Sequence, residues 1–297
     1  DPASAPAALR RCLGPLEVSA QAVGTVGLTL TAVFNIPQAM RTAGSATWIS
    51  YALALIVVLP VGETQVLFRR MPGSPKGIAG YVGVGLGDRL GATASWTLLL
   101  GYGATLIACL LFLGFFLKQL LLHLGWNVPL LLVYLLGGFG CLELGRRDAQ
   151  LSTRTMLLTE SISALIILTL SLLIVWHGWG GPDLRAIDPL NDTATQVRSG
   201  LMVAVLSFIG FESAANLGGE AMDAERALPR SIRTAVLLAG VLFMVWGAFL
   251  PEGLAWLPAA ARQSLDPLSA LAERMGIPGA GLWIKLGAVL CLLGTCI

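Results

Sequence analysis

The sequence predicts an all-α integral membrane protein, and three observations support this prediction. Of the 297 residues, 56% are hydrophobic and 12% are charged, whereas charged residues make up about 25% of a soluble domain. The apolar residues form runs of about 20, the length with which an α-helix crosses a bilayer. Short connections that are polar or rich in proline and glycine separate the runs. Since no segment with the composition of a soluble domain remains, we expect a single transmembrane domain over residues 1–297.

About eight spans are expected, and their order follows the apolar runs. We place them at residues 22–40, 45–68, 92–122, 128–145, 154–177, 198–218, 233–255 and 278–297. If the N-terminus is cytoplasmic, most of the 19 lysine and arginine residues fall in inner loops, so we expect that orientation in a plasma (inner) membrane. The chain begins at Asp1 and ends at Ile297 inside an apolar run, which indicates a part of a longer chain.

Composition also argues against several other classes of protein. A net charge of +2 gives no reason to expect a nucleic-acid partner. The five cysteines match no metal-ligand spacing. The two histidines lie far apart without a nucleophile–base pattern, so we expect neither a metal, nor another cofactor, nor an enzyme. Membrane lipid is the expected surrounding, and the sequence leaves the oligomeric state open.

Two of the spans do not have the pattern of continuous, lipid-facing helices. The first carries Asn35, Pro37 and Gln38, and Pro37 removes a backbone donor inside an apolar run. The sixth carries Glu212 among glycine and serine residues, and a carboxylate in a span costs about 2.5–3.5 kcal/mol on insertion scales. Interrupted backbone at membrane depth is tolerated where it lines protein or a water-filled cavity. We therefore expect both spans to be broken beside a cavity.

The spacing of these two spans indicates an internal repeat. They are five spans apart, as the first helices of two five-span halves would be, and paired broken helices hold the substrate of such transporters near the membrane midplane. Free N–H groups at the break favour an anionic group, and free carbonyl groups favour an ammonium group. An amino acid carries both groups. The alternative is that glycine and serine here only allow close packing of helices.

Several motifs resemble those of a known family. The segments Ser207-Phe-Ile-Gly-Phe-Glu-Ser213, Asn216-Leu-Gly-Gly-Glu-Ala221 and Ala227-Leu-Pro-Arg230 resemble the sixth-span signature of amino acid permeases, members of the amino acid–polyamine–organocation superfamily. Trp96–Tyr102 is similar to the start of the family's third span. The resemblance covers about residues 18–297. It implies a leucine-transporter-like inverted-repeat fold with discontinuous helices 1 and 6, of which about eight spans are present and the second repeat is incomplete.

The resemblance also implies a function and a set of site residues. The function is secondary active transport of amino acids or related amines by alternating access, with the substrate held between the unwound parts of helices 1 and 6. The alternative is a permease-derived membrane receptor or accessory subunit that does not transport. The implied substrate-binding residues are Thr29, Leu30, Thr31, Ala32, Phe34, Tyr102, Leu206, Ser207, Phe208, Gly210, Phe211 and Glu212.

Within that set, the position of the break in the first span depends on the register. If Phe34 and Pro37 mark the register, Leu30-Thr31-Ala32 stands where many members of the family have a Gly-Ser/Ala-Gly break. We then expect the backbone of residues 208–212 to be non-helical and to face residues 29–34 across a cavity, with Phe208 or Phe211 closing one side. Leu206 stands where some cationic amino acid exchangers have tryptophan, which argues against an arginine-type exchanger.

The coupling ion is the last expectation. Glu160 and Ser163 lie in the fifth span and Thr295 lies in the eighth, so we name these three as coupling candidates. A carboxyl group buried in a span can act as a proton carrier. Coupling to H⁺, coupling to Na⁺ and uncoupled exchange all remain open at this point.

Overall fold

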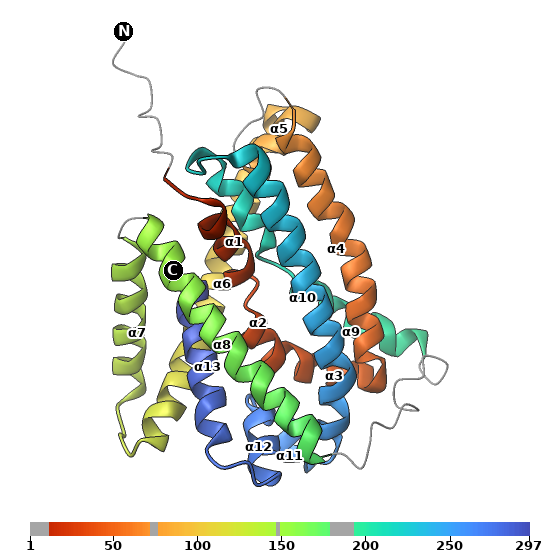
Figure 1. The fold of residues 1–297 in the computed structure, drawn as a ribbon, viewed down its shortest axis with the longest axis vertical. Helices are drawn as coiled ribbons and strands as arrows, with labels where there is room; N and C mark the ends of the chain where they lie inside the picture. The colour runs from red at the N-terminus through yellow and green to blue at the C-terminus, as the bar shows by residue number, and fades with distance from the viewer. Residues whose placement is uncertain (1–11, 72–76, 147–148, 179–192) are drawn as a thin grey trace.

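The computed structural model describes residues 12–71, 77–146, 149–178 and 193–297 (Figure 1). These residues form an all-helical bundle, with one isolated bridge between Leu13 and Ala221 and no strand in the described ranges. Five helical stretches are long and apolar enough to cross a membrane: Pro15–Arg69, Asp88–His123, Leu151–Leu173, Ala194–Gly219 and Ala224–Pro251. Leu130–Gly145 and Ala280–Cys296 are shorter apolar helices. The prediction of an all-α integral membrane protein is confirmed.

Each of the eight predicted spans corresponds to one continuous helix or to several shorter helical pieces in succession. The continuous ones are α4 (Thr47–Arg69), α6 (Asp88–His123), α7 (Leu130–Gly145), α8 (Ala149–Gly178), α10 (Ala224–Ala255) and α13 (Ala280–Cys296). The first span consists of α1 (Pro15–Gly24), α2 (Leu28–Leu30), the π-helical η2 (Thr31–Asn35) and α3 (Ile36–Ala43). The sixth consists of α9 (Ala194–Leu206) and the 3-10 helix η6 (Phe211–Gly219).

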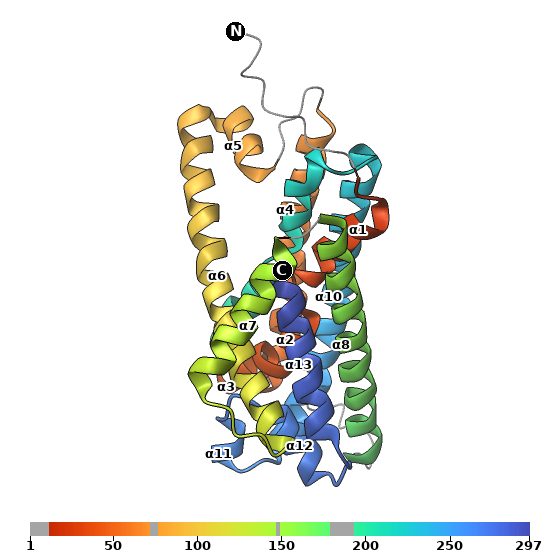
Figure 2. The ribbon, with the colours of Figure 1, turned by 90° about the vertical axis from the view of Figure 1, so that its left-hand side faces the viewer.

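Helix boundaries differ from the predicted ones because polar segments at the span ends are helical too. The clearest case is α10, which begins at Ala224 and not at 233. Outside the spans lie helices that hydropathy does not report: the 3-10 turn η3 (Gly44–Ala46), α5 (Ile78–Leu86), α11 (Ala259–Arg262) and α12 (Pro267–Arg274). In Figures 1 and 2, α5 lies at one end of the bundle and α11 and α12 lie at the other. We call these the α5 end and the α12 end.

The bundle has a packed interior and an apolar outer surface. The first span, η6, α10 and α13 supply most of the buried residues, and α10 packs along α4 while α13 packs against α6 and α8. By contrast, α6 and α7 expose large apolar side chains such as Trp96 (67%), Leu131 (71%) and Phe139 (66%). Figure 2 shows α6 running along one side of the bundle. Apolar side chains in this number on the outside are stable in lipid and not in water.

A candidate substrate site at two helix breaks

The break in the first span lies at residues 25–27. Helix α1 ends at Gly24, and Gly27 has a φ of +64° before α2 begins at Leu28. A left-handed φ of this kind is accessible to glycine at little cost, so Gly27 is the residue that allows the chain to turn. The expected break at Leu30-Thr31-Ala32 is therefore wrong in register, since these residues lie in α2 and in the π-helical stretch that follows.

Pro37 does not interrupt the first span because the preceding π-helical turn accommodates it. The N–H of Ile36 bonds to the carbonyl oxygen of Thr31, five residues back, in place of the usual four. Pro37 then lies in the first turn of α3, where a missing N–H costs little. The sequence pattern correctly indicated an irregular first span, but it placed the break at residues 30–32 and not between the two glycines Gly24 and Gly27.

The break in the sixth span lies at residues 207–210. Helix α9 ends at Leu206, the chain turns, and Gly210 has a φ of +120° before η6 begins. The carboxylate of Glu212 accepts a hydrogen bond from the N–H of Gly210 at 2.8 Å and another from the hydroxyl of Tyr102 at 3.3 Å. The predicted discontinuity of the sixth span is thus confirmed, and Glu212 stabilises its turn.

The two breaks pack directly against each other. The hydroxyl oxygen of Thr25 lies 2.7 Å from the carbonyl oxygen of Gly210 and 2.7 Å from the hydroxyl of Ser213. It also lies 2.5 Å from the carbonyl oxygen of Gln21. A Cβ atom added at Gly210 would come within 2.3 Å of the backbone oxygen of Thr25. The sixth-span break therefore faces residues 25–26 of the first span, and not residues 29–34 as expected.

A cavity of about 330 Å³ lies beside this contact. Its lining comes from α1, α6, α8, η6 and the end of α13: Gln21, Thr25, Tyr102, Thr105, Leu106, Cys109, Met156, Ile209, Gly210, Ser213, Asn216, Leu217, Thr295, Cys296 and Ile297. None of these lining side chains carries a charge. The cavity thus combines hydroxyl and amide groups at the breaks with an apolar wall.

Three of the residues predicted from the sequence line the cavity, namely Tyr102, Gly210 and the coupling candidate Thr295. Thr29, Thr31 and Ala32 are fully buried further along the first span, where Leu30 and Phe34 are half-buried. None of these five is among the lining residues.

The other predicted residues of the sixth span point elsewhere. Ser207 is buried and hydrogen-bonds to the Tyr51 hydroxyl at 3.0 Å. Phe208 packs edge-on against Phe243, with ring centroids 5.3 Å apart. Phe211 packs toward α4, and Leu206 is 60% exposed on the outside of α9. The expectation that Phe208 or Phe211 closes the cavity is therefore not met, because both rings fill the protein interior.

Gln21, Thr25, Ser213 and Asn216 line the cavity and were absent from the predicted set. The sequence could have indicated Thr25 as a site residue, because it lies between Gly24 and Gly27. Two glycines spaced in this way permit a sharp turn in an apolar run, and Thr25 is the polar residue between them.

The three coupling candidates all contact the first span near its break. Glu160 on α8 accepts a hydrogen bond from the N–H of Leu28 at 2.8 Å. The hydroxyls of Ser163 and Thr29 are hydrogen-bonded to each other. Thr295 on α13 donates to the carbonyl oxygen of Gly24 at 3.3 Å. These contacts join α8 and α13 to both sides of the break.

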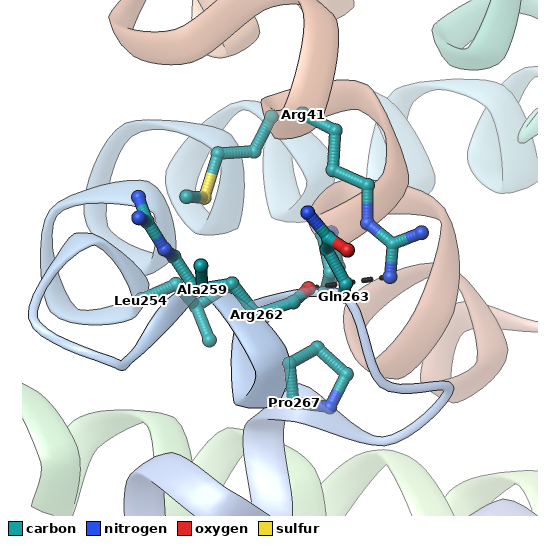
Figure 3. Close-up of a pocket in the computed structure, with 8 residues that line it drawn as sticks. Arg41, Leu254, Ala259, Arg262, Gln263 and Pro267 are labelled. Atoms are coloured by element: carbon teal, nitrogen blue, oxygen red, sulfur yellow. Dashed lines mark hydrogen bonds between the residues drawn. The ribbon is translucent and has the colours of Figure 1, made fainter.

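A second cavity, of about 520 Å³, lies toward the α12 end (Figure 3). Its lining residues belong to α3 and to the region around α11: Pro37, Met40, Arg41, Leu254, Ala259, Arg262, Gln263 and Pro267. The guanidinium of Arg41 donates to the carbonyl oxygens of Arg262 at 3.2 Å and Ser264 at 2.9 Å. Residues 28–36, most of them buried, separate the parts of the first span that line the two cavities.

Removal of the Arg41 side chain is expected to weaken the contact between α3 and the 262–264 backbone at the α12 end. In Arg41→Ala the two hydrogen bonds to the 262–264 backbone are lost. We therefore expect conformations in which α3 has separated from this backbone to gain about 1 kcal/mol, or about fivefold in population. The measurement is the rate of maleimide labelling of Met40→Cys in a cysteine-free background. Thr42→Ala removes a neighbouring hydroxyl that bonds only within its own helix turn, and it serves as the control. Equal labelling rates for the Met40→Cys protein alone, with Arg41→Ala and with Thr42→Ala would show that Arg41 does not hold α3 against this backbone.

Several known proteins are similar in sequence to this chain. The profile of the amino acid permease family matches residues 13–297. The chain is 29% identical over 233 residues to the L-methionine/branched-chain amino acid exporter of Escherichia coli (strain K12), covering 77% of this chain and 54% of that protein. It is 26% identical over 228 residues to the low-affinity putrescine importer of the same organism, covering 75% and 49%.

A mammalian relative extends the comparison to almost the whole chain. Cationic amino acid transporter 4 of Mus musculus is 25% identical over 310 residues, covering 97% of this chain and 47% of that protein. The chain spans about half the length of these curated relatives, and they are transporters and not enzymes. With a family match over nearly all of its length, this chain belongs to the amino acid permease family.

Proposed function

We propose that the chain forms the substrate-holding part of a secondary active transporter for amino acids, with the 330 Å³ cavity at the two helix breaks as the substrate site. The observation that supports this most is the direct packing of the two breaks, in which Thr25 contacts both Gly210 and Ser213. Irregular backbone of this kind persists in a membrane only where protein or a cavity satisfies it. The cavity volume lies at the lower end of the range of about 300–1,000 Å³ for small-molecule sites.

The lining favours a neutral amino acid as the substrate. Hydroxyl and amide groups of Gln21, Thr25 and Ser213 suit an α-amino and α-carboxyl group, while Leu106 and Ile209 suit an apolar side chain. Among the described lining residues no charged side chain would balance a second charge on the ligand, and a buried unpaired charge is costly. The curated relatives include an exporter of methionine and branched-chain amino acids as well as transporters of amines and cationic amino acids, so the choice needs a direct test.

Orientation follows from the distribution of basic residues. We propose that the α5 end is cytoplasmic, since α4 ends and α10 begins at this end of the bundle (Figure 1). Arg69 is the last residue of α4, and Arg226 and Arg230 lie in the first turns of α10. The substrate cavity then lies on the inner side of the breaks, lined by α1 and η6, and the cavity beside Arg41 lies on the outer side. Two cavities with buried segments between them are the arrangement that alternating access requires.

The test is counterflow of radiolabelled amino acids by the full-length protein in proteoliposomes. We expect unlabelled leucine, methionine or valine on the inside to accelerate uptake of the labelled amino acid, and arginine and putrescine to have little effect. Acceleration by arginine or putrescine alone would overturn the neutral class. Saturable binding without uptake or exchange of any compound would overturn transport and would favour a permease-derived receptor.

A further inference from the structure

The carboxyl group of Glu160 occupies an unusual position in the bundle. Its side chain is 3% exposed, and one oxygen accepts the N–H of Leu28, the first residue after the break in the first span. The other oxygen makes no hydrogen bond of normal length and angle to a described residue, although the thiol of Cys291 and the N–H of Thr29 lie close to the carboxyl group. A buried carboxyl oxygen is normally satisfied, so this vacant acceptor calls for an explanation.

The surroundings of Glu160 supply no positive charge. The described ion pairs join Arg154 to Glu17, Arg233 to Glu63 and Lys285 to Asp266, and none of them includes Glu160. The titratable groups that face it are thiols: Cys291 on α13, with Cys109 on α6 beyond it.

The remaining neighbours of Glu160 are uncharged. Thr29 on the first span and Ser163 on α8 itself are hydrogen-bonded to each other beside it. Burial without a counter-ion disfavours the anionic form of a carboxyl group and favours its protonated form.

Building on the proposed transport function, we propose that Glu160 binds the proton that is moved together with, or in exchange for, the amino acid. As an anion, Glu160 makes a charge-assisted hydrogen bond to the N–H of Leu28 and holds α2 against α8. A proton on its vacant oxygen neutralises the carboxyl, weakens that bond and adds an O–H donor, for which the sulfur of Cys291 is the neighbouring acceptor. Loss of the proton restores the first arrangement, so the group carries one proton per cycle.

The proton site and the substrate cavity are coupled through the break in the first span. Leu28 lies three positions after Thr25 in the chain, and Thr25 lines the substrate cavity while contacting Gly210. A change in the position of Leu28 therefore shifts the wall of the cavity. Two ligands that favour different positions of one segment are thermodynamically coupled, and the coupling acts equally in both directions.

A cation such as Na⁺ fits the Glu160 position less well than a proton. The N–H of Leu28 points at one oxygen, and a thiol is a poor ligand for a hard cation, which prefers several oxygen ligands. Within the described parts of the chain no group of three histidine, cysteine or acidic side chains could hold a metal ion. A sodium gradient nevertheless belongs in the experiment as a separate arm.

The experiment compares the native protein with Glu160→Gln in proteoliposomes. We expect the native protein to concentrate labelled amino acid under a pH gradient of one orientation, up to about tenfold per pH unit for one proton. Glu160→Gln is expected to lose this accumulation and to retain counterflow at equal pH, because the amide keeps the size of the side chain and cannot titrate. Glu225→Gln replaces an exposed carboxylate in the first turn of α10. It is the matched control and should accumulate like the native protein.

A spectroscopic measurement tests the proton site without transport. In infrared difference spectra of a pH titration, the native protein and Glu225→Gln should show a protonated-carboxyl C=O band that is absent from Glu160→Gln. Glu160→Asp keeps a titratable group and should retain both the band and part of the accumulation, which covers the case in which the glutamine variant fails to fold.

The outcomes separate the two proposals. Accumulation by Glu160→Gln equal to that of the native protein, or accumulation driven by sodium and not by protons, would overturn the role of Glu160. Absence of counterflow by the native protein with every amino acid would overturn the proposed function, and the infrared band would still decide whether Glu160 binds a proton.

Discussion

Replacing Gly210 by alanine is expected to abolish amino acid counterflow and to lower the free energy of unfolding by about 2–4 kcal/mol. The new Cβ would lie 2.3 Å from the backbone oxygen of Thr25 and 2.9 Å from the backbone nitrogen of Val26. Backbone atoms of a packed span cannot move aside as a flexible side chain can, so overpacking costs about 1–3 kcal/mol. A φ of +120° adds strain for any residue with a Cβ.

The matched control for Gly210 is Gly101→Ala on α6. Gly101 lies in a regular helix, and a Cβ added there meets no atom within 4 Å. That substitution should leave counterflow unchanged and stabilise the helix by about 0.5–1 kcal/mol. The measurements are counterflow in proteoliposomes and thermal unfolding in detergent. Normal counterflow by Gly210→Ala would show that the close contact of the two breaks is not needed for transport.

Replacing Thr25 by valine is expected to weaken substrate binding by about tenfold or more while leaving the fold intact. The Thr25 hydroxyl has a single hydrogen, which it can donate to the carbonyl oxygen of Gly210 or of Gln21. The hydroxyl of Ser213 can in turn donate to Thr25. Valine has the same shape without the oxygen, so it leaves these polar groups unpaired beside the cavity, at a cost of about 1–3 kcal/mol each.

The substitution Thr25→Ser separates a polar role from a packing role. Serine keeps the hydroxyl and loses the methyl group, so we expect it to recover most of the affinity in a binding titration of the purified protein. Loss of affinity in the serine variant and normal affinity in the valine variant would show that the methyl group matters and that the hydrogen bonds do not. Circular dichroism of both variants checks that the helical content is unchanged.

Some features of this protein can be predicted from its amino-acid sequence without the tertiary structure. Apolar runs separated by polar and proline- or glycine-rich connections correctly predicted an all-α membrane protein, because the free energy of placing a helix in lipid depends on its own composition. Two spans with polar and helix-breaking residues correctly predicted discontinuous helices 1 and 6. The permease motif around Glu212 correctly predicted the family.

The location of the first break could not be read in this way. Proline at 37 and the paired glycines at 24 and 27 are both breakers, and local propensity does not say which of them interrupts the helix. In the folded protein a π-turn accommodates Pro37, while Gly27 takes the left-handed φ. Glu160 satisfies the free N–H of Leu28 after this break, and it does so from a helix far away in the sequence.

The orientation of the side chains of the sixth span could not be predicted from the sequence either. Phe208, Phe211 and Gly210 lie within one turn and are equally plausible as cavity residues, yet Gly210 alone of the three lines the cavity. The two rings are held by α10 and α4, which determine how η6 is rotated. Hydropathy and breaker residues thus act over a few positions, and they were sufficient to predict the class of protein and its two broken helices. Which side chains line the cavity depends on contacts among the first span, η6, α8 and α13, and these contacts exist only once the bundle has packed.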